Sequence, residues 1–249
     1  MRILVCIKQV PDTLDVRFDP ASGYLKREDM PAAMNPYDQC ALEAAARLKD
    51  RDPSIHMTVL TMGPSGSERV LREALAVAAD EAYMISDHML RGIDTVGTAK
   101  VLSAAIRKIE AEAGEPFDAI FCGLKSSDGA GNCIGPMLAA LFKLPCQTNV
   151  MTLQKEALQI PCVLTFGKAD YSMRYPKILR IIEAQQQEIT RFDMEDLKTD
   201  APAIRGQDGP ALLSMKYRPL NKKRRIIKGK TAEEAAIVIT GILKRQHII

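Results

Sequence analysis

Short apolar runs alternate with segments of helical spacing along residues 1–145, and few folds accommodate such an alternation. The runs occupy residues 3–7, 56–61, 81–86 and 118–122. Apolar residues recur at helical spacing in the segments between them, at 36–49, 67–78, 95–109 and 136–144. Repetition of strand, loop and helix predicts a mostly parallel sheet with right-handed crossovers and helices on both faces. We therefore predict a doubly wound α/β fold, in which ligands bind at the carboxyl ends of the strands.

The alternation weakens after residue 145. We expect one more strand at residues 163–166 and a strand or a short helix within residues 181–192. A closing helix that begins with a capping pattern is expected at residues 231–245. The stretch 198–230 is rich in Lys, Arg, Pro and Gly, which is typical of an extended arm. We expect an α/β domain over residues 1–197, followed by an arm and a helix over residues 198–249.

Composition excludes several classes of function. Of the 249 residues, 34 are Lys or Arg and 31 are Asp or Glu, so the chain has no basic field for nucleic acid. Three His and six Cys without a C-x-x-C pair give no metal-binding pattern. No apolar run approaches the roughly 20 residues that a membrane span needs. We expect a reduced, cytoplasmic protein without stable membrane insertion, and we interpret the basic run 222–225 as a contact with a partner protein.

The glycine-rich loop 122–136 follows a predicted strand and opens a helix. Gly129 and Gly131 allow the backbone to approach a ligand closely, and amide groups at a helix start form an anion site. Lys125 and Ser126 add donors. The loop matches neither the phosphate-binding G-K-[ST] pattern nor G-x-G-x-x-G. Nucleotide binding and a plain glycine-rich connection both fit this pattern.

Two further helix starts, at residues 35–38 and 94–98, have the same ambiguity. Each offers a phosphate site, and each is also explained by simple capping. The carboxylates nearby, including Asp12, Asp38 and Asp94, lie where capping accounts for them. The chain contains no nucleophile elbow and no Ser, His, Asp order. We therefore assign no catalytic residue and no metal ligand.

Several motifs together resemble one family. Residues 7–13 (IKQVPDT) resemble the K-Q-V-P-D-T opening of electron transfer flavoprotein β subunits. Residues 35–43 resemble their N-P-x-D-x-x-A-L-E segment, and residues 61–64 and 71–76 resemble T-M-G-P and L-R-E-A-L-A. The order and spacing agree to about residue 150, and the similarity resumes at residues 174–176 and near 226–236.

The resemblance implies a fold, a partner and a cofactor. It implies a Rossmann-like, adenine-nucleotide-binding domain with a C-terminal arm that contacts an α subunit carrying FAD. The β subunit itself would bind AMP or, as in electron-bifurcating members, a second FAD. The residues that would line this site are Cys6, Lys8, Val10, Pro11, Asn35, Asp38, Thr61, Met62, Gly63, Asp94, Thr95, Thr98, Cys122, Gly123, Ser126, Asp128, Gly129, Gly131, Asn132, Cys133 and Gly135.

Residues 94–98 are similar to the D-T-x-A-T stretch of bifurcating members, which favours FAD. The family's D-G-D-T-A-Q-V-G-P reads D-G-A-G-N-C-I-G-P here, so the usual Thr hydroxyl is missing at residue 131. The stretch 152–166 is also shorter than in the family. These differences leave open a second hypothesis, a non-redox adenine-nucleotide-binding module that keeps the fold without electron transfer.

Residues 174–179 (RYPKIL) resemble the loop with which the family docks onto partner dehydrogenases. Ile178 stands at the position of the family's anchoring Leu. The resemblance implies that Tyr175, Ile178 and Leu179 contact such a partner, with an apolar side chain as the anchor.

Overall fold

The central strand of the protein is β1 (Arg2–Cys6), all five residues of which are buried. In the computed structural model it belongs to a seven-stranded sheet of order β7-β8-β6-β1-β4-β5-β9. The other strands are β4 (His56–Met62), β5 (Glu81–Ile85), β6 (Ala119–Gly123), β7 (Cys146–Val150), β8 (Cys162–Phe166) and β9 (Thr190–Phe192). All six pairings between neighbours are parallel, so the predicted doubly wound α/β fold is confirmed, with a wholly parallel main sheet.

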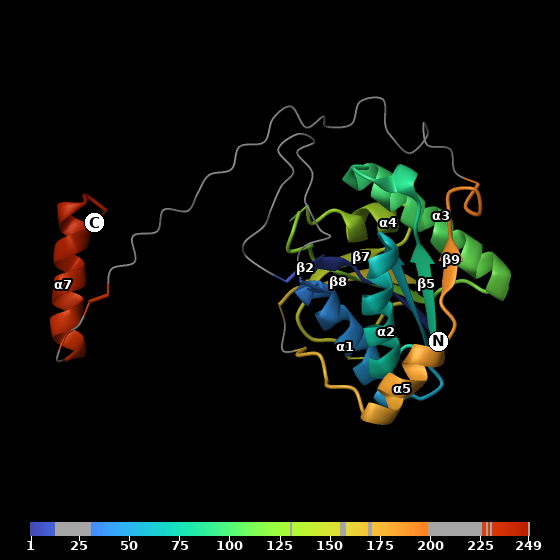
Figure 1. Cartoon of the computed structure of the whole chain (residues 1–249), viewed down its shortest axis with the longest axis horizontal. Coiled ribbons are helices and arrows are strands. Elements are labelled where there is room, and N and C mark those ends of the chain that lie inside the picture. The colour runs from blue at the N-terminus through green and yellow to red at the C-terminus, as the bar shows by residue number, and fades with distance from the viewer. Residues whose placement is uncertain are drawn as a thin grey trace. The chain divides into compact units, whose positions relative to one another are not determined.

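The structure describes residues 1–12, 31–129, 131–154, 158–168, 171–198, 226–227, 229 and 231–248. Helices cover both faces of the sheet (Figure 1). The helices α1 (Pro36–Arg51) and α2 (Glu68–Val77) bury their apolar sides in a core with Ile3 and Val5 of β1, and α5 (Ile178–Gln186) adds Ala184 to this core. The helices α3 (Thr95–Ala113) and α4 (Ile134–Phe142) share the opposite core with Leu4 and Cys6. Alternation along β1 therefore divides the interior into two layers.

The chain reverses direction across the sheet at β1. From β1 it proceeds through β4 to β5, and it then returns to place β6 on the other side of β1. The carboxyl ends of β1 and β6 thus lie side by side while their connections leave in opposite directions. Parallel sheets bind ligands outside such a switch point, because the diverging loops leave a crevice there.

Three features differ from the sequence expectation or add to it. Residues 146–150 form β7, although four of its five residues are exposed and its sequence, CQTNV, lacks an apolar run. Strands β2 (Gln9–Pro11) and β3 (Ala32–Met34) pair antiparallel as a small separate sheet. Residues 181–192 contain both the end of α5 and β9, whereas the sequence predicts one or the other.

The chain separates into units 1–212 and 213–249. The second unit contains α7 (Ala232–Arg245), where Thr231 accepts a hydrogen bond from the Glu234 amide at 3.2 Å, as expected of a capping residue. Most of the predicted arm, including residues 199–225, lies outside the described residues. None of the helices described is long and apolar enough to cross a membrane.

Candidate functional site

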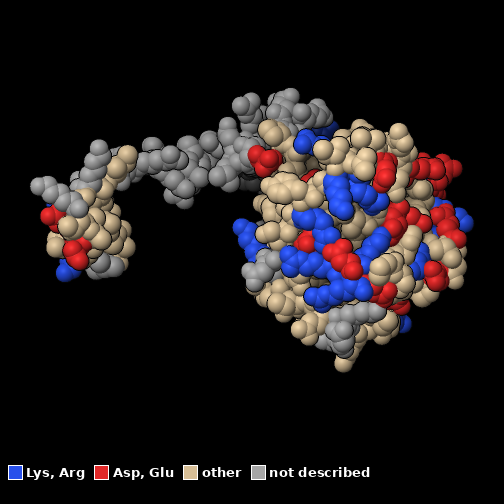
Figure 2. Space-filling model, turned by 90° about the horizontal axis from the view of Figure 1, so that it is seen from below, with Lys and Arg blue, Asp and Glu red and all other residues tan. Residues whose placement is uncertain are grey.

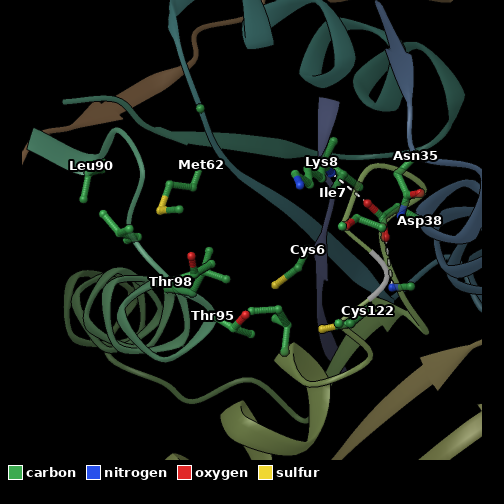
Figure 3. A pocket seen from close by; sticks show the side chains of 18 of the residues that line it. Cys6, Ile7, Lys8, Asn35, Asp38, Met62, Leu90, Thr95, Thr98 and Cys122 are labelled. Carbon is green, nitrogen blue, oxygen red and sulfur yellow. Dashed lines mark hydrogen bonds between the residues drawn. The ribbon is translucent and has the colours of Figure 1, made fainter. Parts of the chain in front are cut away.

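A cavity of about 1050 Å³ opens at the switch point (Figure 3). Its walls come from the ends of β1, β4 and β6, from the loops after β4 and β5, and from the first turns of α1, α3 and α4. The lining includes Cys6, Lys8, Asn35, Asp38, Thr95 and Cys122, which come from segments far apart in the sequence. The fold therefore gathers the predicted motifs around one hollow.

Asp38 fastens the two strands that border the switch point. Its Oδ2 atom accepts a hydrogen bond from the Lys8 amide at 2.8 Å, and its Oδ1 atom accepts one from the Gly123 amide at 3.1 Å. Burial raises the pKa of this carboxyl to about 7, although hydrogen bonds from Asn35, Lys8 and Gly123 act in the opposite direction. Asp38 thus holds the ends of β1 and β6 together at the cavity wall.

Asn35 fixes the glycine-rich loop instead of capping α1. Its buried side chain donates from Nδ2 to the Lys125 carbonyl at 2.9 Å, and its Oδ1 accepts from the Ser127 amide at 3.1 Å. The structure shows no side-chain cap at this helix start, where Pro36 supplies a favourable first residue. The N-P-Y-D segment therefore orders two neighbouring loops, a role that neither alternative from the sequence foresees.

Lys8 and Asp128 join the first loop to the glycine-rich loop. The Lys8 Nζ atom lies 2.7 Å from Asp128 Oδ1, and the side chain of Asp128 is almost fully buried while that of Lys8 is partly exposed. The ion pair holds the ammonium group at the cavity wall. It leaves part of the Lys8 charge directed toward the hollow, where it attracts an anion.

The start of α3 contains two threonines with different roles. The Asp94 side chain caps the helix by accepting from the Gly97 amide at 2.7 Å, and the Thr98 hydroxyl donates to the Asp94 carbonyl at 2.8 Å. Thr95 also lines the cavity, and a Cβ atom added to Gly131 would lie 3.8 Å from its Oγ1 atom. The starts of α3 and α4 thus meet across the cavity, and their positive ends favour a negatively charged group.

Most of the residues implied by the resemblance line this cavity. Five of them do not line it: Val10, Pro11, Thr61, Asp128 and Gly135. Thr61 is fully buried and packs on the α1 and α2 face of β4, because alternate strand residues point to opposite faces. Gly135 faces β8, where an added Cβ would meet Thr165 at 2.2 Å. Val10 and Pro11 pair with β3, and Asp128 reaches the cavity only through Lys8.

The site residues implied by the resemblance do not include the far end of the cavity, although this end is built by a loop at the carboxyl edge of the sheet, where ligand binding is expected. Residues 86–93, between β5 and α3, contribute Ser86, Asp87, His88, Leu90, Arg91, Gly92 and Ile93 to the lining. Leu90 and Ile93 stand near Met62 and Leu102, so this end is more apolar than the glycine-rich end. The only sequence signal for it is positional, because the loop follows a parallel strand and belongs to the same edge of the sheet.

A second surface, the segment 174–179, lies away from the cavity at the start of α5; it is called the docking segment after the role that the resemblance implies for it. Tyr175, Ile178 and Leu179 are 99%, 76% and 72% exposed. Arg174 anchors the segment to α1: its Nε atom lies 2.9 Å from Glu43 Oε2 and its Nη2 atom 2.7 Å from Asp50 Oδ2. Figure 2 views the sheet domain from below Figure 1, on the side of α5, and shows Lys and Arg interspersed with Asp and Glu over this face. The segment thus exposes apolar side chains to solvent, while the Arg174 ion pairs hold its backbone against α1.

The described residues contain no group of three or more His, Cys, Asp or Glu side chains that could hold a metal ion. What the cavity offers is a pair of helix starts, a partly neutralised lysine and an apolar end. This arrangement suits an elongated ligand with an anionic centre and an apolar ring.

Comparison with known proteins defines the class. The Electron transfer flavoprotein domain matches residues 23–177, and the chain belongs to this family. The chain is 36% identical, over the full length of both chains, to the caffeyl-CoA reductase-Etf complex subunit CarD of Acetobacterium woodii. It is 36% identical to the electron transfer flavoprotein subunit beta of Megasphaera elsdenii, covering 96% of this chain and 95% of that one. Protein FixA of Azotobacter vinelandii is 33% identical over 90% of this chain and 86% of its own.

Proposed function

We propose that this chain is the β subunit of a heterodimeric electron transfer flavoprotein, whose α subunit carries FAD. In this role it supports electron transfer through flavins between dehydrogenases and an acceptor in the cytoplasm. Support comes from the family match and from near full-length relatives that are named β subunits or Etf complex subunits. The motifs that carry the similarity are also the ones that build the cavity wall, as Asn35 and Asp38 illustrate.

We further propose that the cavity binds FAD in preference to AMP. The observation that carries this proposal is the continuity of one cavity of about 1050 Å³ from the glycine-rich loop to the apolar end at Leu90 and Ile93. Ligand pockets commonly occupy about 300–1,000 Å³, so this one is large for a mononucleotide. A dinucleotide would place its phosphates between the starts of α3 and α4 and its ring system toward Met62.

The residues of this chain would bind and orient the cofactor. Amide groups at the starts of α3 and α4, with the Thr95 hydroxyl, would hold the phosphates. Lys8 would add positive charge, and Asp38 and Asn35 would keep the loops in place. The flavin supplies the redox chemistry when bound, since no protein group needs to accept the electrons.

The docking segment would contact the partner dehydrogenases. Ile178 and Leu179 are large apolar side chains held in solvent, and exposed apolar residues of this kind commonly anchor interfaces. Tyr175 adds an aromatic side chain beside them. Because Arg174 fastens the segment to α1, little conformational freedom would be lost on docking.

The nucleotide content of the purified complex tests these proposals. The chain is co-expressed with its α subunit, the heterodimer is denatured, and FAD and AMP are measured in the supernatant. We expect two FAD per heterodimer. One FAD with one AMP would refute FAD binding by this subunit and retain the β-subunit assignment. Separately eluting, colourless chains that release AMP alone would refute the assignment in favour of the non-redox nucleotide-binding module.

A further inference from the structure

Two cysteines face each other at the base of the cavity. Cys6 ends β1, Cys122 lies near the end of β6, and the two are register partners in neighbouring parallel strands. Both side chains point to the α3 and α4 face and line the cavity, where Figure 3 shows their sulfur atoms. The Cys6 side chain lies close enough to raise the pKa of the Cys122 thiol. A pair of thiols therefore lies at the switch point. Electron transfer by a bound flavin does not require these two thiols.

We propose that Cys6 and Cys122 form a dithiol site for a soft, thiophilic centre such as trivalent arsenic. Neighbouring strands lie about 4.8 Å apart, so two in-register side chains on one face can bind one bridging atom. Sulfur ligands favour soft centres over hard cations. With an organic arsine oxide, two As–S bonds form, the As–O bond breaks, and both thiol protons leave with the oxygen as water. The arsenic keeps its oxidation state, so no oxidant or reductant is required.

The environment of the pair favours bidentate capture over ordinary alkylation. Cys6 is 8% exposed and Cys122 is 3% exposed, and the neighbouring Cys6 side chain together with burial raises the pKa of the Cys122 thiol well above its usual range. Alkylating reagents require the thiolate and an open approach, so they react slowly here. Condensation with an arsine oxide removes the thiol protons as water, and the cavity provides the approach.

The remaining cysteines are placed differently. Cys133 lines the cavity, but its thiol donates to the Gly131 carbonyl at 2.6 Å within its own loop. The Cys40 thiol donates to the Pro36 carbonyl at 3.4 Å inside α1. Cys146 is exposed on β7 with Cys162 nearby, and this second pair is the competing candidate for capture. Cys146 therefore supplies the matched control.

The test uses the full-length chain freed of nucleotide and incubated with phenylarsine oxide and excess glutathione. Glutathione removes arsenic held by one sulfur, whereas a chelate of two sulfurs resists it. We expect one arsenical per chain by native mass spectrometry. Cys6→Ser and Cys122→Ser should each weaken retention by about 100-fold or more, and Cys146→Ser should leave it unchanged. Loss of capture in Cys146→Ser alone, or capture unaffected in both Cys6→Ser and Cys122→Ser, would overturn the assignment.

Two additions keep the result independent of folding and of the nucleotide proposal. Far-UV circular dichroism and a thermal melt verify that each serine variant is folded, and Cys6→Ala and Cys122→Ala repeat the measurement without a polar substituent.

A competition experiment, which rests on the proposed function, adds FAD or AMP first. We expect bound nucleotide to slow capture at least tenfold. An unchanged rate with nucleotide bound would refute shielding of the pair, whereas a chain that binds no nucleotide but captures the arsenical would refute only the proposed function.

Discussion

The Oδ1 atom of Asp38 lies 3.1 Å from the amide nitrogen of Gly123, so the first turn of α1 is fastened directly to the end of β6. Contact this close requires a residue without a side chain. A Cβ atom on Gly123 would lie 2.1 Å from Asp38 Oδ1 and 2.8 Å from the Cβ atom of Tyr37. The glycine at this position therefore allows α1 to approach the end of β6 closely. A larger residue would push α1 away from the sheet.

Gly123→Ala should destabilise the protein by about 2 kcal/mol, since overpacking a tight contact forces the backbone to shift. The free energy of unfolding in urea measures the effect. Gly66→Ala is the matched control, because a Cβ atom at Gly66 meets nothing within 4 Å. Equal stabilities of the two variants would contradict the close-contact interpretation.

Asp38→Asn should flatten the pH dependence of stability between pH 4 and 7. Burial raises the pKa of Asp38 from 3.8 to about 7, so the folded protein retains a proton that the unfolded chain releases in this window. The stabilisation linked to this proton is complete below pH 4 and is lost as the pH rises to 7, an effect of at most about 4 kcal/mol. Urea unfolding at pH 5 and pH 7.5 compares the two proteins, and an identical slope in both would rule out titration of Asp38.

Arg174→Ala should cost about 2 kcal/mol and loosen the docking segment. Burial raises the pKa of Glu43, but hydrogen bonds from Arg174 and Arg47 outweigh it and lower the pKa. Removing Arg174 leaves a buried carboxylate with one of its two cationic partners. Limited proteolysis within residues 171–179 should accelerate. Lys177→Ala, an exposed change in the same segment, is the control, and equal proteolysis rates in both variants would show that Arg174 does not brace it.

Thr95→Val should weaken nucleotide binding more than Thr98→Val. The Thr98 hydroxyl is already committed to the Asp94 carbonyl, whereas Thr95 lines the cavity opposite Gly131. Loss of one hydrogen bond to phosphate corresponds to about 1 kcal/mol or more, which is at least a fivefold change in dissociation constant. Isothermal titration of the nucleotide-free heterodimer with FAD and AMP measures it. A larger effect from Thr98→Val would reverse the proposed roles.

Ile178→Glu should slow electron transfer between the heterodimer and the dehydrogenase it serves by about 30-fold, as expected for a central apolar anchor. Flavin content and heterodimer formation should stay normal, since Ile178 lies in the docking segment and not in the cavity lining. Stopped-flow reduction of the flavin reports the rate. Leu141→Glu, at an exposed apolar position on α4, should behave like the natural protein. Equal rates for both variants would exclude the segment from docking.

The sequence predicts the parts of the fold whose side-chain pattern reflects burial. Buried strands such as β1 consist of consecutive apolar residues, and α1 and α3 show helical spacing, so their order defines the sheet. Strand β7 could not be found in this way, because an exposed strand at the side of the sheet needs no apolar run. The resemblance identified most of the cavity lining, but it could not show that Asn35 and Asp38 use their polar atoms on neighbouring loops. Such pairings depend on which segments the fold brings together.

The crossover from β8 to β9 has a consequence for where the chain can be shortened. The family match ends at residue 177, yet β9, at residues 190–192, supplies the outer neighbour of β5. A chain cut after Lys177 would expose the backbone amides and carbonyls of Tyr83, Met84 and Ile85 as an unprotected sheet edge. Open edges of this kind recruit other strands and aggregate. The smallest soluble version of this domain therefore extends beyond Phe192, well past the stretch by which its family is recognised.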